Sequence, residues 1–398
     1  MSESGKIRVL IVDDSAFMCR VLQSIINADP QLEVIGTARD GREAVSAAET
    51  LKPDVITMDI NMPHVDGLQA TEVIMSTNPR PIVIVSSESR DGAEPTLKSL
   101  ELGAIDFVTK PSAAIDLDMN TVRAELCRKL KVASKVRVVR NASRVAMRPT
   151  TTDVSTADAG TTATLGLAKI GPGGNGDGNS AKGPAPGAAP VFSSTPARAT
   201  ERFPVVVVAA STGGPQTLMR LVPQFSGNFP GAVLLIQHMP GAFTSKFSQQ
   251  LAEISPLNVK EAEQGELMKP GSLYVCPGSH HLRVSPTGRI TLDDGPRVAG
   301  YRPCADLAME TVATFAGPMA TAVVLTGMGA DGSRGVRAVK NSGGFVLAQD
   351  EATSVIFGMP SEAIKTGAVD AVLGIDAIYP AIEKRVLYVY GAQKVGAL

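Results

Sequence analysis

The chain has 398 residues, of which 44% are hydrophobic and 19% charged, and its 38 Lys and Arg nearly balance its 39 Asp and Glu. A chain of this length is longer than one hydrophobic core usually accommodates, so we expect two domains. A net charge of −1 argues against general binding to nucleic acid or to a membrane surface, for which a basic excess is typical.

The sequence also predicts a cytoplasmic protein with no segment inserted in a membrane. No apolar run reaches the roughly 20 residues that span a bilayer, and the first residues lack an apolar stretch long enough for a secretory signal. The four cysteines have no metal-type spacing, so we expect reduced, buried thiols. They are Cys19, Cys127, Cys276 and Cys304.

Residues 1–132 alternate short apolar runs with helical stretches. The runs are "KIRVLIV", "LEVIGTA", "DVITM", "PIVIVSS" and "IDFVT". The helices between and after them are expected to begin near Ala16, Gly41, Leu68, Ala93 and Asp118. Such alternation predicts an α/β fold, here a doubly wound parallel sheet of five strands.

Polar residues follow the strands of this first sheet. Asp13 and Asp14 close the first strand, Asp59 the third, Ser86 the fourth and Lys110 the fifth. The carboxyl ends of parallel strands share one edge, so these groups should converge there. Carboxylate oxygens with room for water suit Mg²⁺, and an ammonium with a hydroxyl can hold phosphoryl oxygens. The pattern predicts a site at which Asp59 accepts a phosphoryl group.

Residues 6 to about 125 resemble the receiver domain of a two-component response regulator. The matching motifs are "VDDS", "MDINMP.VDG", "VSS" and "GA.DFVTKP". The resemblance implies that Asp59 is the phospho-acceptor. It also implies that Asp13, Asp14 and Asp59 bind Mg²⁺ together with the backbone carbonyl of Asn61.

The same resemblance assigns a conformational switch. Ser86 and Phe107 would move when Asp59 is phosphorylated, and Lys110 would pair with the phosphoryl oxygens. His64, in the loop after Asp59, is expected to be an ordinary surface residue.

Residues 133–202 differ in composition from both flanking parts. They are rich in Gly, Pro, Ala, Ser and Thr, as in "GPGGNGDGNSAKGPAPGAAP". Such a segment cannot bury enough apolar surface to offset the entropy of ordering, so it is predicted to be a flexible linker. As a coil it would span about 45 Å.

Residues 203–398 return to alternating strands and helices. The clearest strands are "FPVVVVAA", "AVLLIQ", "TAVVLTG" and "GFVLAQ", and residues 271–296 contain hairpin-like runs divided by Gly and Pro. We expect a second, larger α/β domain with a mostly parallel sheet that includes some antiparallel pairing.

A serine, a histidine and an aspartate end strands of this second sheet. Ser211 follows the first strand, where it could serve as a helix N-cap or as a nucleophile that needs a base. His238 closes the next strand at the same edge and is the candidate base. Asp331, in a Gly-rich loop, is the candidate acceptor that orients the histidine, with Asp306 and Asp350 as competitors.

Other features of residues 203–398 bear on which reaction this part of the chain could catalyse. Backbone N–H groups around Met328, or those after Ser211, could hold an oxyanion. His280 and His281 are expected to be surface residues of a turn. The motif G-x-S-x-G of the common esterases is absent around Ser211.

Residues 203 to about 385 resemble the catalytic domain of the chemotaxis protein-glutamate methylesterases. The matching motifs are "ASTGGPQTL", "QHMP..FT..F...L", "LTGMGADG..G" and "AQDEATSVIFGMP.EA". The resemblance implies a catalytic triad of Ser211, His238 and Asp331, with Thr212 and Met328 in support.

The substrates implied are methyl esters on glutamates of methyl-accepting chemotaxis receptors, and some members of the family also deamidate receptor glutamines. The phosphodonor implied is the chemotaxis histidine kinase. In the family, phosphorylation of the receiver relieves its block of the triad, and the ester hydrolysis needs no cofactor. Two departures stand out: the linker is long, and Cys304 replaces the serine found in related sequences.

The sequence disfavours two other functions. A receptor-docking or phosphate-sink protein would bind without hydrolysis, but it would not need to retain Ser211, His238 and Asp331 together. A DNA-binding regulator would need a helix-turn-helix with a basic face, and the sequence contains no such pattern.

Overall fold

The computed structural model describes residues 5–86, 90–110, 119–136, 138 and 202–396. Residues 139–201, which make up most of the predicted linker, lie outside the described residues. The two folded parts are described separately below.

The first part contains a parallel sheet of five strands in the order β2-β1-β3-β4-β5. The strands are β1 (Ile7–Val12), β2 (Leu32–Ala38), β3 (Val55–Met58), β4 (Ile82–Ser86) and β5 (Asp106–Thr109). The helices are α1 (Ala16–Asn27), α2 (Gly41–Leu51), α3 (Gly67–Thr77), α4 (Arg90–Leu102) and α5 (Met119–Ala133). Each helix begins within three residues of its predicted start.

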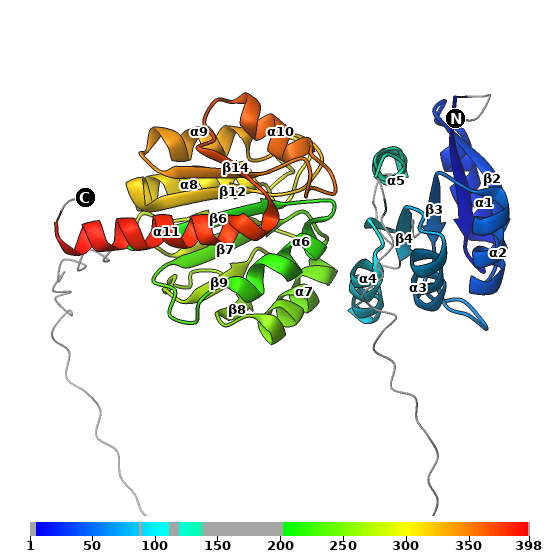
Figure 1. Cartoon of the computed structure of the whole chain (residues 1–398), viewed down its shortest axis with the longest axis horizontal. Coiled ribbons are helices and arrows are strands. Elements are labelled where there is room, and N and C mark those ends of the chain that lie inside the picture. The colour runs from blue at the N-terminus through cyan, green and yellow to red at the C-terminus, as the bar shows by residue number, and fades with distance from the viewer. Residues whose placement is uncertain (1–4, 87–89, 111–118, 137, 139–201, 397–398) are drawn as a thin grey trace, which may run out of the picture. The chain divides into compact units, whose positions relative to one another are not determined.

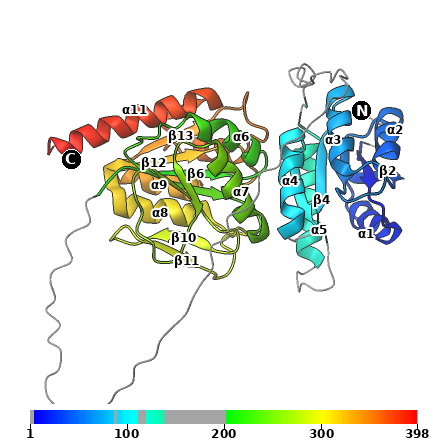
Figure 2. The same ribbon diagram turned by 90° about the horizontal axis from the view of Figure 1, so that it is seen from below.

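Helices cover both faces of this sheet (Figures 1 and 2). Val9 and Ile11 of β1 pack with α1 and α5, whereas Leu10 and Val12 point to the face covered by α2, α3 and α4. Successive side chains of a strand point to opposite faces, so a strand that is apolar throughout must be buried on both sides. The predicted doubly wound fold is confirmed.

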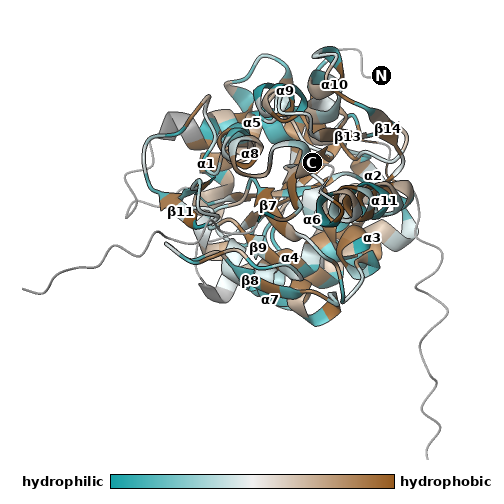
Figure 3. Cartoon of the chain, turned by 90° about the vertical axis from the view of Figure 1, so that its left-hand side faces the viewer, coloured by the Kyte–Doolittle hydropathy of each residue, from teal (hydrophilic) through white to brown (hydrophobic). Residues whose placement is uncertain are grey.

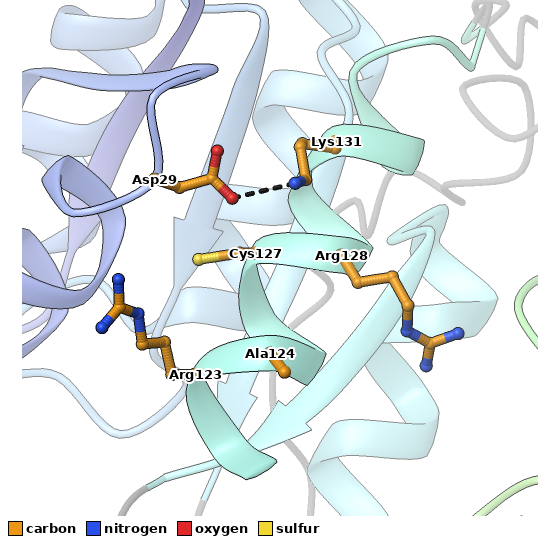
Figure 4. A pocket seen from close by; sticks show the side chains of 6 residues that line it. All are labelled: Asp29, Arg123, Ala124, Cys127, Arg128 and Lys131. Carbon is orange, nitrogen blue, oxygen red and sulfur yellow. Dashed lines mark hydrogen bonds and ion pairs between the residues drawn. The ribbon is translucent and has the colours of Figure 1, made fainter. Parts of the chain in front are cut away.

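Helix α5 is joined to the end of α1 by polar contacts (Figure 4). Lys131 Nζ lies 2.8 Å from Asp29 Oδ2, and this hydrogen bond holds the pKa of Asp29 below its usual value. Arg123 donates to the carbonyl of Ala28 at 3.3 Å. Lys131 and Arg123, which line the pocket between these residues, already have partners within the chain. We therefore assign the pocket a structural role.

The second part contains a sheet of seven strands in the order β14-β13-β12-β6-β7-β9-β8. These strands are β6 (Val205–Ala210), β7 (Ala232–Gln237), β8 (Asn258–Glu261), β9 (Ser272–Val275), β12 (Ala320–Val324), β13 (Phe345–Gln349) and β14 (Ala371–Leu373). The helices are α6 (Gly214–Leu221), α7 (Gly241–Ile254), α8 (Ala305–Ala316), α9 (Ser333–Asn341), α10 (Gly358–Lys365) and α11 (Ile375–Lys394).

All pairings within this sheet are parallel. The antiparallel pairing expected inside it lies instead in a separate two-stranded sheet of β10 (His281–Val284) and β11 (Ile290–Asp293). The observed pairing differs from the expected one because β9, which lies in the region expected to form hairpins, pairs in parallel with β7 in the larger sheet.

The core of this part lies on both faces of β6. Val206 and Val208 pack in the cluster that contains residues of α6, α7 and α11, whereas Val205 and Val207 belong to the cluster with α8, α9 and α10. Figure 3 shows the contrast between apolar strands such as β7 and the polar surface of helix α9. The three layers leave the carboxyl ends of the central strands open at one edge.

The state of the cysteines follows the prediction from composition. All four cysteines are free and buried, as predicted. Within the described part of the chain, no helix is both long enough and apolar enough to cross a membrane.

Two helical glycines provide a matched test of the packing. A Cβ at Gly67 would collide with the backbone carbonyl oxygen of Asp59, whereas Gly391 of α11 has nothing within 4 Å. We expect Gly67→Ala to reduce the free energy of unfolding by about 1–3 kcal/mol, because the backbone of Asp59 must move. Gly391→Ala should be neutral or stabilising by up to about 1 kcal/mol. Urea unfolding followed by circular dichroism measures both, and equal midpoints for the two variants would contradict the packing described.

Candidate functional sites

Ser211 and His238 are neighbours at the open edge of the larger sheet. In the β6–β7 register Ala210 is opposite Gln237, so the next residue on each strand is Ser211 or His238. The N–H of His238 donates to the carbonyl of Ala210 at 3.0 Å, and the N–H of Ser211 donates to the carbonyl of Thr326 at 3.0 Å. The ends of β6, β7 and β12 are thus tied together where the two polar side chains begin.

The side chain of Gln237 links the ends of β6 and β7. Its buried side-chain amide donates to the carbonyl of Ser211 at 3.0 Å and to that of His238 at 3.1 Å. One rigid planar group thereby sets the spacing of the two backbones. Our sequence analysis missed Gln237, although a glutamine at the end of an otherwise apolar strand was a usable signal.

The turn after Ser211 requires its two glycines. Gly213 has φ +75°, and a Cβ there would collide with Val355. A Cβ at Gly214 would collide with the side-chain oxygen of Gln237. The N-cap of α6 is Gly213, without a side-chain capping bond, so Ser211 does not serve as the cap.

His238 is paired with Asp331. Its Nε2 lies 2.7 Å from Asp331 Oδ2, and both side chains are largely buried. The other ring nitrogen, Nδ1, is buried without a hydrogen-bond partner among the described residues. Nδ1 is therefore the nitrogen available to accept a proton.

The carboxylate of Asp331 is held at the start of α8. It accepts hydrogen bonds from the N–H groups of Ala305 at 2.7 Å, Asp306 at 3.0 Å and Gly332 at 3.0 Å. Burial alone would raise the pKa of Asp331, but the hydrogen bond and charge of His238, with these N–H donors, hold it below its usual value. The carboxylate is thus kept ionised and fixed in direction.

Cys304 supplies a further donor to the same carboxylate. Its Sγ lies 3.2 Å from Asp331 Oδ1. Burial, reinforced by the charge of Asp331, raises the pKa of the Cys304 thiol to about 12. The thiol therefore stays protonated and can donate throughout the neutral range.

The two competing aspartates have other partners. Asp306 accepts from the N–H groups of Arg334 at 3.0 Å and Gly335 at 2.7 Å, at the start of α9. Asp350 accepts from the N–H and hydroxyl of Thr353 in a local turn. Of the three candidates, Asp331 is the one that meets His238.

The hydroxyl of Ser211 makes no hydrogen bond to His238 within the described residues. Catalytic hydrogen bonds are often long before substrate binds, so the neighbouring backbones are the relevant observation. The loop after β12 also approaches Ser211, because a Cβ on Gly327 would lie 2.8 Å from Ser211 Cβ. Thr212 lies against the same loop, and its carbonyl accepts from the hydroxyl of Thr326 at 3.0 Å. The loop after β12, which contains Met328, therefore lies next to Ser211 and Thr212.

The remaining histidines lie elsewhere. His281 is 1% exposed in β10, with Nε2 at 3.0 Å from the carbonyl of Pro296, so the expectation of a surface residue is wrong for it. Its place in the antiparallel hairpin points the ring inward. His280 precedes that strand and is partly exposed, and His64 is exposed, as expected.

The smaller sheet carries the predicted acidic site. Carboxylate oxygens of Asp13, Asp14 and Asp59 lie within 4.8 Å of one another. Lys110 Nζ lies 2.9 Å from Asp13 Oδ2 and 2.9 Å from Asp59 Oδ2. Burial raises the pKa of Asp59, although the hydrogen bond from Lys110 opposes this effect. Burial also disfavours the charge of Lys110, but its bonds to Asp59 and Asp13 outweigh it and raise its pKa.

This acidic cluster fits Mg²⁺ by its donor set. Its ligand atoms are all carboxylate oxygens, Asp14 is exposed, and Asn61 is exposed two residues after Asp59. Such a half-open oxygen site leaves room for the waters that Mg²⁺ retains.

The predicted switch residues lie on β4 and β5. The hydroxyl of Thr96 in α4 donates to Ser86 Oγ at 2.8 Å. The N–H of Lys110 donates to the carbonyl of Ser86 at 2.7 Å. Phe107 pairs with Ile84 across the strands. Lys110 therefore joins Ser86 to the acidic cluster through its backbone N–H, while Phe107 lies beside β4 on the neighbouring strand.

The chain is similar to known proteins over both of its folded parts. The family model of the response regulator receiver domain matches residues 9–121, and that of the CheB methylesterase matches residues 206–382. A "Protein-glutamate methylesterase/protein-glutamine glutaminase" of Pyrococcus abyssi is 41% identical over 395 residues, covering 98% of this chain and 96% of the relative.

Two solved structures from Thermotoga maritima correspond to the two parts. The CheB methylesterase catalytic domain is 39% identical, covers 47% of this chain and 100% of its own, and has a TM-score of 0.45. The response regulator domain of CheB is 48% identical, covers 33% of this chain and 98% of its own, and has a TM-score of 0.31. The two family models and the nearly full-length relative show that the chain belongs to the protein-glutamate methylesterase/protein-glutamine glutaminase family, with a response regulator receiver domain ahead of a CheB methylesterase domain.

Proposed function

We propose that this protein is a phosphorylation-activated hydrolase that removes methyl esters from glutamates of methyl-accepting chemotaxis receptors. The proposed receiver spans residues 1–132, the linker 133–202 and the catalytic domain 203–398. The observation that carries the proposal is the buried His238–Asp331 pair at 2.7 Å, with Ser211 next to His238 across paired strands.

The proposed reaction is acyl transfer through Ser211. His238 Nδ1 takes the hydroxyl proton while Oγ attacks the ester carbonyl, and N–H groups near Met328 or after Ser211 stabilise the oxyanion. The proton then passes to the leaving methoxide, and methanol departs. Water attacks the acyl-enzyme by the same route, which releases glutamate and restores Ser211. Asp331 stabilises the imidazolium at each stage.

Deamidation of receptor glutamines would follow the same course. The amide nitrogen takes the proton from His238 and leaves as ammonia, and the acyl-enzyme is again hydrolysed to glutamate. The name of the Pyrococcus abyssi relative, which includes protein-glutamine glutaminase, supports this second reaction. Neither reaction calls on a cofactor in the catalytic domain.

The receiver would control this chemistry. Asp59 accepts a phosphoryl group from a chemotaxis histidine kinase, and Asp13, Asp14, Asp59 and the carbonyl of Asn61 would hold Mg²⁺. Bound there, Mg²⁺ would neutralise charge between the phosphodonor and Asp59. Lys110 would pair with the phosphoryl oxygens, and Ser86 and Phe107 would relay the change.

Two further points bear on the proposal. The four free, buried cysteines are typical of a reducing compartment, so we place the reaction in the cytoplasm. The non-catalytic docking alternative gives no reason to anchor Asp331 by backbone and thiol donors opposite a histidine.

The nucleophile can be tested directly. Ser211→Ala should lower methanol release from methylated receptor membranes by about three orders of magnitude or more, because no hydroxyl remains to form the acyl-enzyme. Ser245→Ala, an exposed position of α7, should leave the rate unchanged. A fluorophosphonate probe should label the parent protein and the Ser245→Ala variant but not Ser211→Ala. Turnover by the Ser211→Ala variant at the parent rate would exclude the proposed mechanism.

Gating has its own test. A small-molecule phosphodonor with Mg²⁺ should raise turnover of the full chain, and Asp59→Asn should abolish the rise while keeping the basal rate. Glu72→Gln, an exposed position of α3, should keep the rise. Chelation of Mg²⁺ should remove activation alone. Equal turnover with and without phosphodonor in the parent protein would show that phosphorylation does not control the site.

The thiol of Cys304 provides a third test. Cys304→Ala should lower kcat about 3- to 10-fold, since Asp331 loses one donor to a buried charge. Cys304→Ser keeps a donor and should stay within about twofold of the parent. Steady-state methanol release measures both variants. If the alanine and serine variants were equally slow, the hydrogen bond would not be the reason for the loss.

A further inference from the structure

Tyr301 lies against the base of the proposed triad. Its ring stacks on the imidazole of His238, with centroids 4.4 Å apart and planes inclined by 17°. The residue belongs to the segment between β11 and α8, and neither the sequence motifs nor the triad assignment includes it. A near-parallel stack at this distance covers one face of the imidazole ring.

The backbone of Tyr301 is held by a tight turn. The N–H of Tyr301 donates to the carbonyl of Val298 at 2.9 Å, and the reverse bond measures 3.0 Å. The two residues between them, Ala299 and Gly300, have φ of +50° and +88°. Positive φ at both central positions is typical of the type I′ turn, which joins two short strands rigidly. The ring therefore projects from a fixed backbone.

The far end of the ring is also confined. The phenolic hydroxyl lies 3.4 Å from the carbonyl oxygen of Met328, a long hydrogen bond. A Cβ on Gly329 would collide with that hydroxyl, so the glycine makes the room that the phenol occupies. Burial raises the pKa of Tyr301, and the phenol stays neutral beside the imidazole. Tyr301 thus spans from the turn to the loop at the proposed oxyanion site.

This placement matters because a single bond orients His238. Asp331 holds Nε2, while Nδ1 has no hydrogen-bond partner among the described residues. One hydrogen bond leaves the imidazole free to tilt about that bond, and a tilt would change the direction in which Nδ1 points. A flat ring stacked on the imidazole opposes this tilt, and it also stabilises the imidazolium through its π face.

Resting on the proposed function, we propose that Tyr301 is a positioning residue: its ring fixes the plane of His238 so that Nδ1 faces Ser211. The essential property is the flat aromatic face. The hydroxyl contributes only a long contact to Met328 and should be dispensable.

Three variants of the full-length protein separate these properties. Tyr301→Phe keeps the ring and should retain kcat within about twofold. Tyr301→Leu and Tyr301→Met fill the space without a flat face and should lower kcat about 10- to 100-fold, an effect typical of a misplaced general base. KM for methylated receptor should change less than about twofold, because Tyr301 acts on His238 and not on substrate binding. Tyr388→Leu, which removes an exposed tyrosine of α11, is the matched control and should behave as the parent.

The rate of fluorophosphonate labelling at Ser211 gives a second readout that needs no receptor. It should fall in the leucine and methionine variants in parallel with kcat and remain unchanged in the phenylalanine variant. Circular dichroism and urea unfolding identify any variant that has lost its fold. Should the leucine and methionine variants not fold, a loss of labelling in the folded phenylalanine variant would still overturn the proposal.

Each outcome bears on one claim. Parent-like kcat and labelling in the leucine or methionine variant would overturn the role of Tyr301. Equal losses in the phenylalanine and leucine variants would assign the effect to the hydroxyl and also overturn it. Activity in Ser211→Ala would instead remove the proposed function, whatever the Tyr301 variants show.

Discussion

The buried carboxylate of Asp331 is the constraint on which the larger domain depends. A charge removed from water must be compensated, and here the compensation comes from backbone N–H groups at the start of α8, the thiol of Cys304 and the ring of His238. These partners come from two separate parts of the chain, residues 304–306 and His238. The proposed base is therefore positioned by the same bonds that pack α8 against the loop after β12.

Close approach between backbone segments positions the other residues at the carboxyl-terminal edge of the larger sheet. Gln237 ties the ends of β6 and β7 together, and glycines at 213, 214 and 327 allow side chains and loops to approach where a Cβ would collide. Tyr301 then covers the imidazole ring. The backbones that carry the proposed nucleophile and base are thus fixed mainly by main-chain geometry.

The receiver also carries polar side chains at the carboxyl ends of parallel strands, but their chemistry is different. Its parallel strands also bring polar residues to one edge, but there the groups are carboxylates of like charge, held together by Lys110. Burial raises the pKa of Asp59 and so disfavours its charge, a state that a cation or a phosphoryl group would change. In the proposed mechanism a change of charge in one domain controls acyl transfer in the other.

The sequence by itself determined the five strands and five helices of the receiver, the four central strands of the larger sheet and the polar residues at the strand ends, because apolar alternation and strand-end positions are local patterns. The edge strands β8 and β14 were not predicted. It could name Ser211, His238 and three candidate aspartates, and it could place the acidic site of the receiver. Only the tertiary structure decided that Asp331, and not Asp306 or Asp350, meets His238, because that choice depends on how α8 packs against a loop distant in the chain. The same holds for Tyr301 and the buried His281, whose partners are brought close by folding and leave no local pattern, and for the two backbone partners of Gln237, although its place at the end of an apolar strand is a local signal.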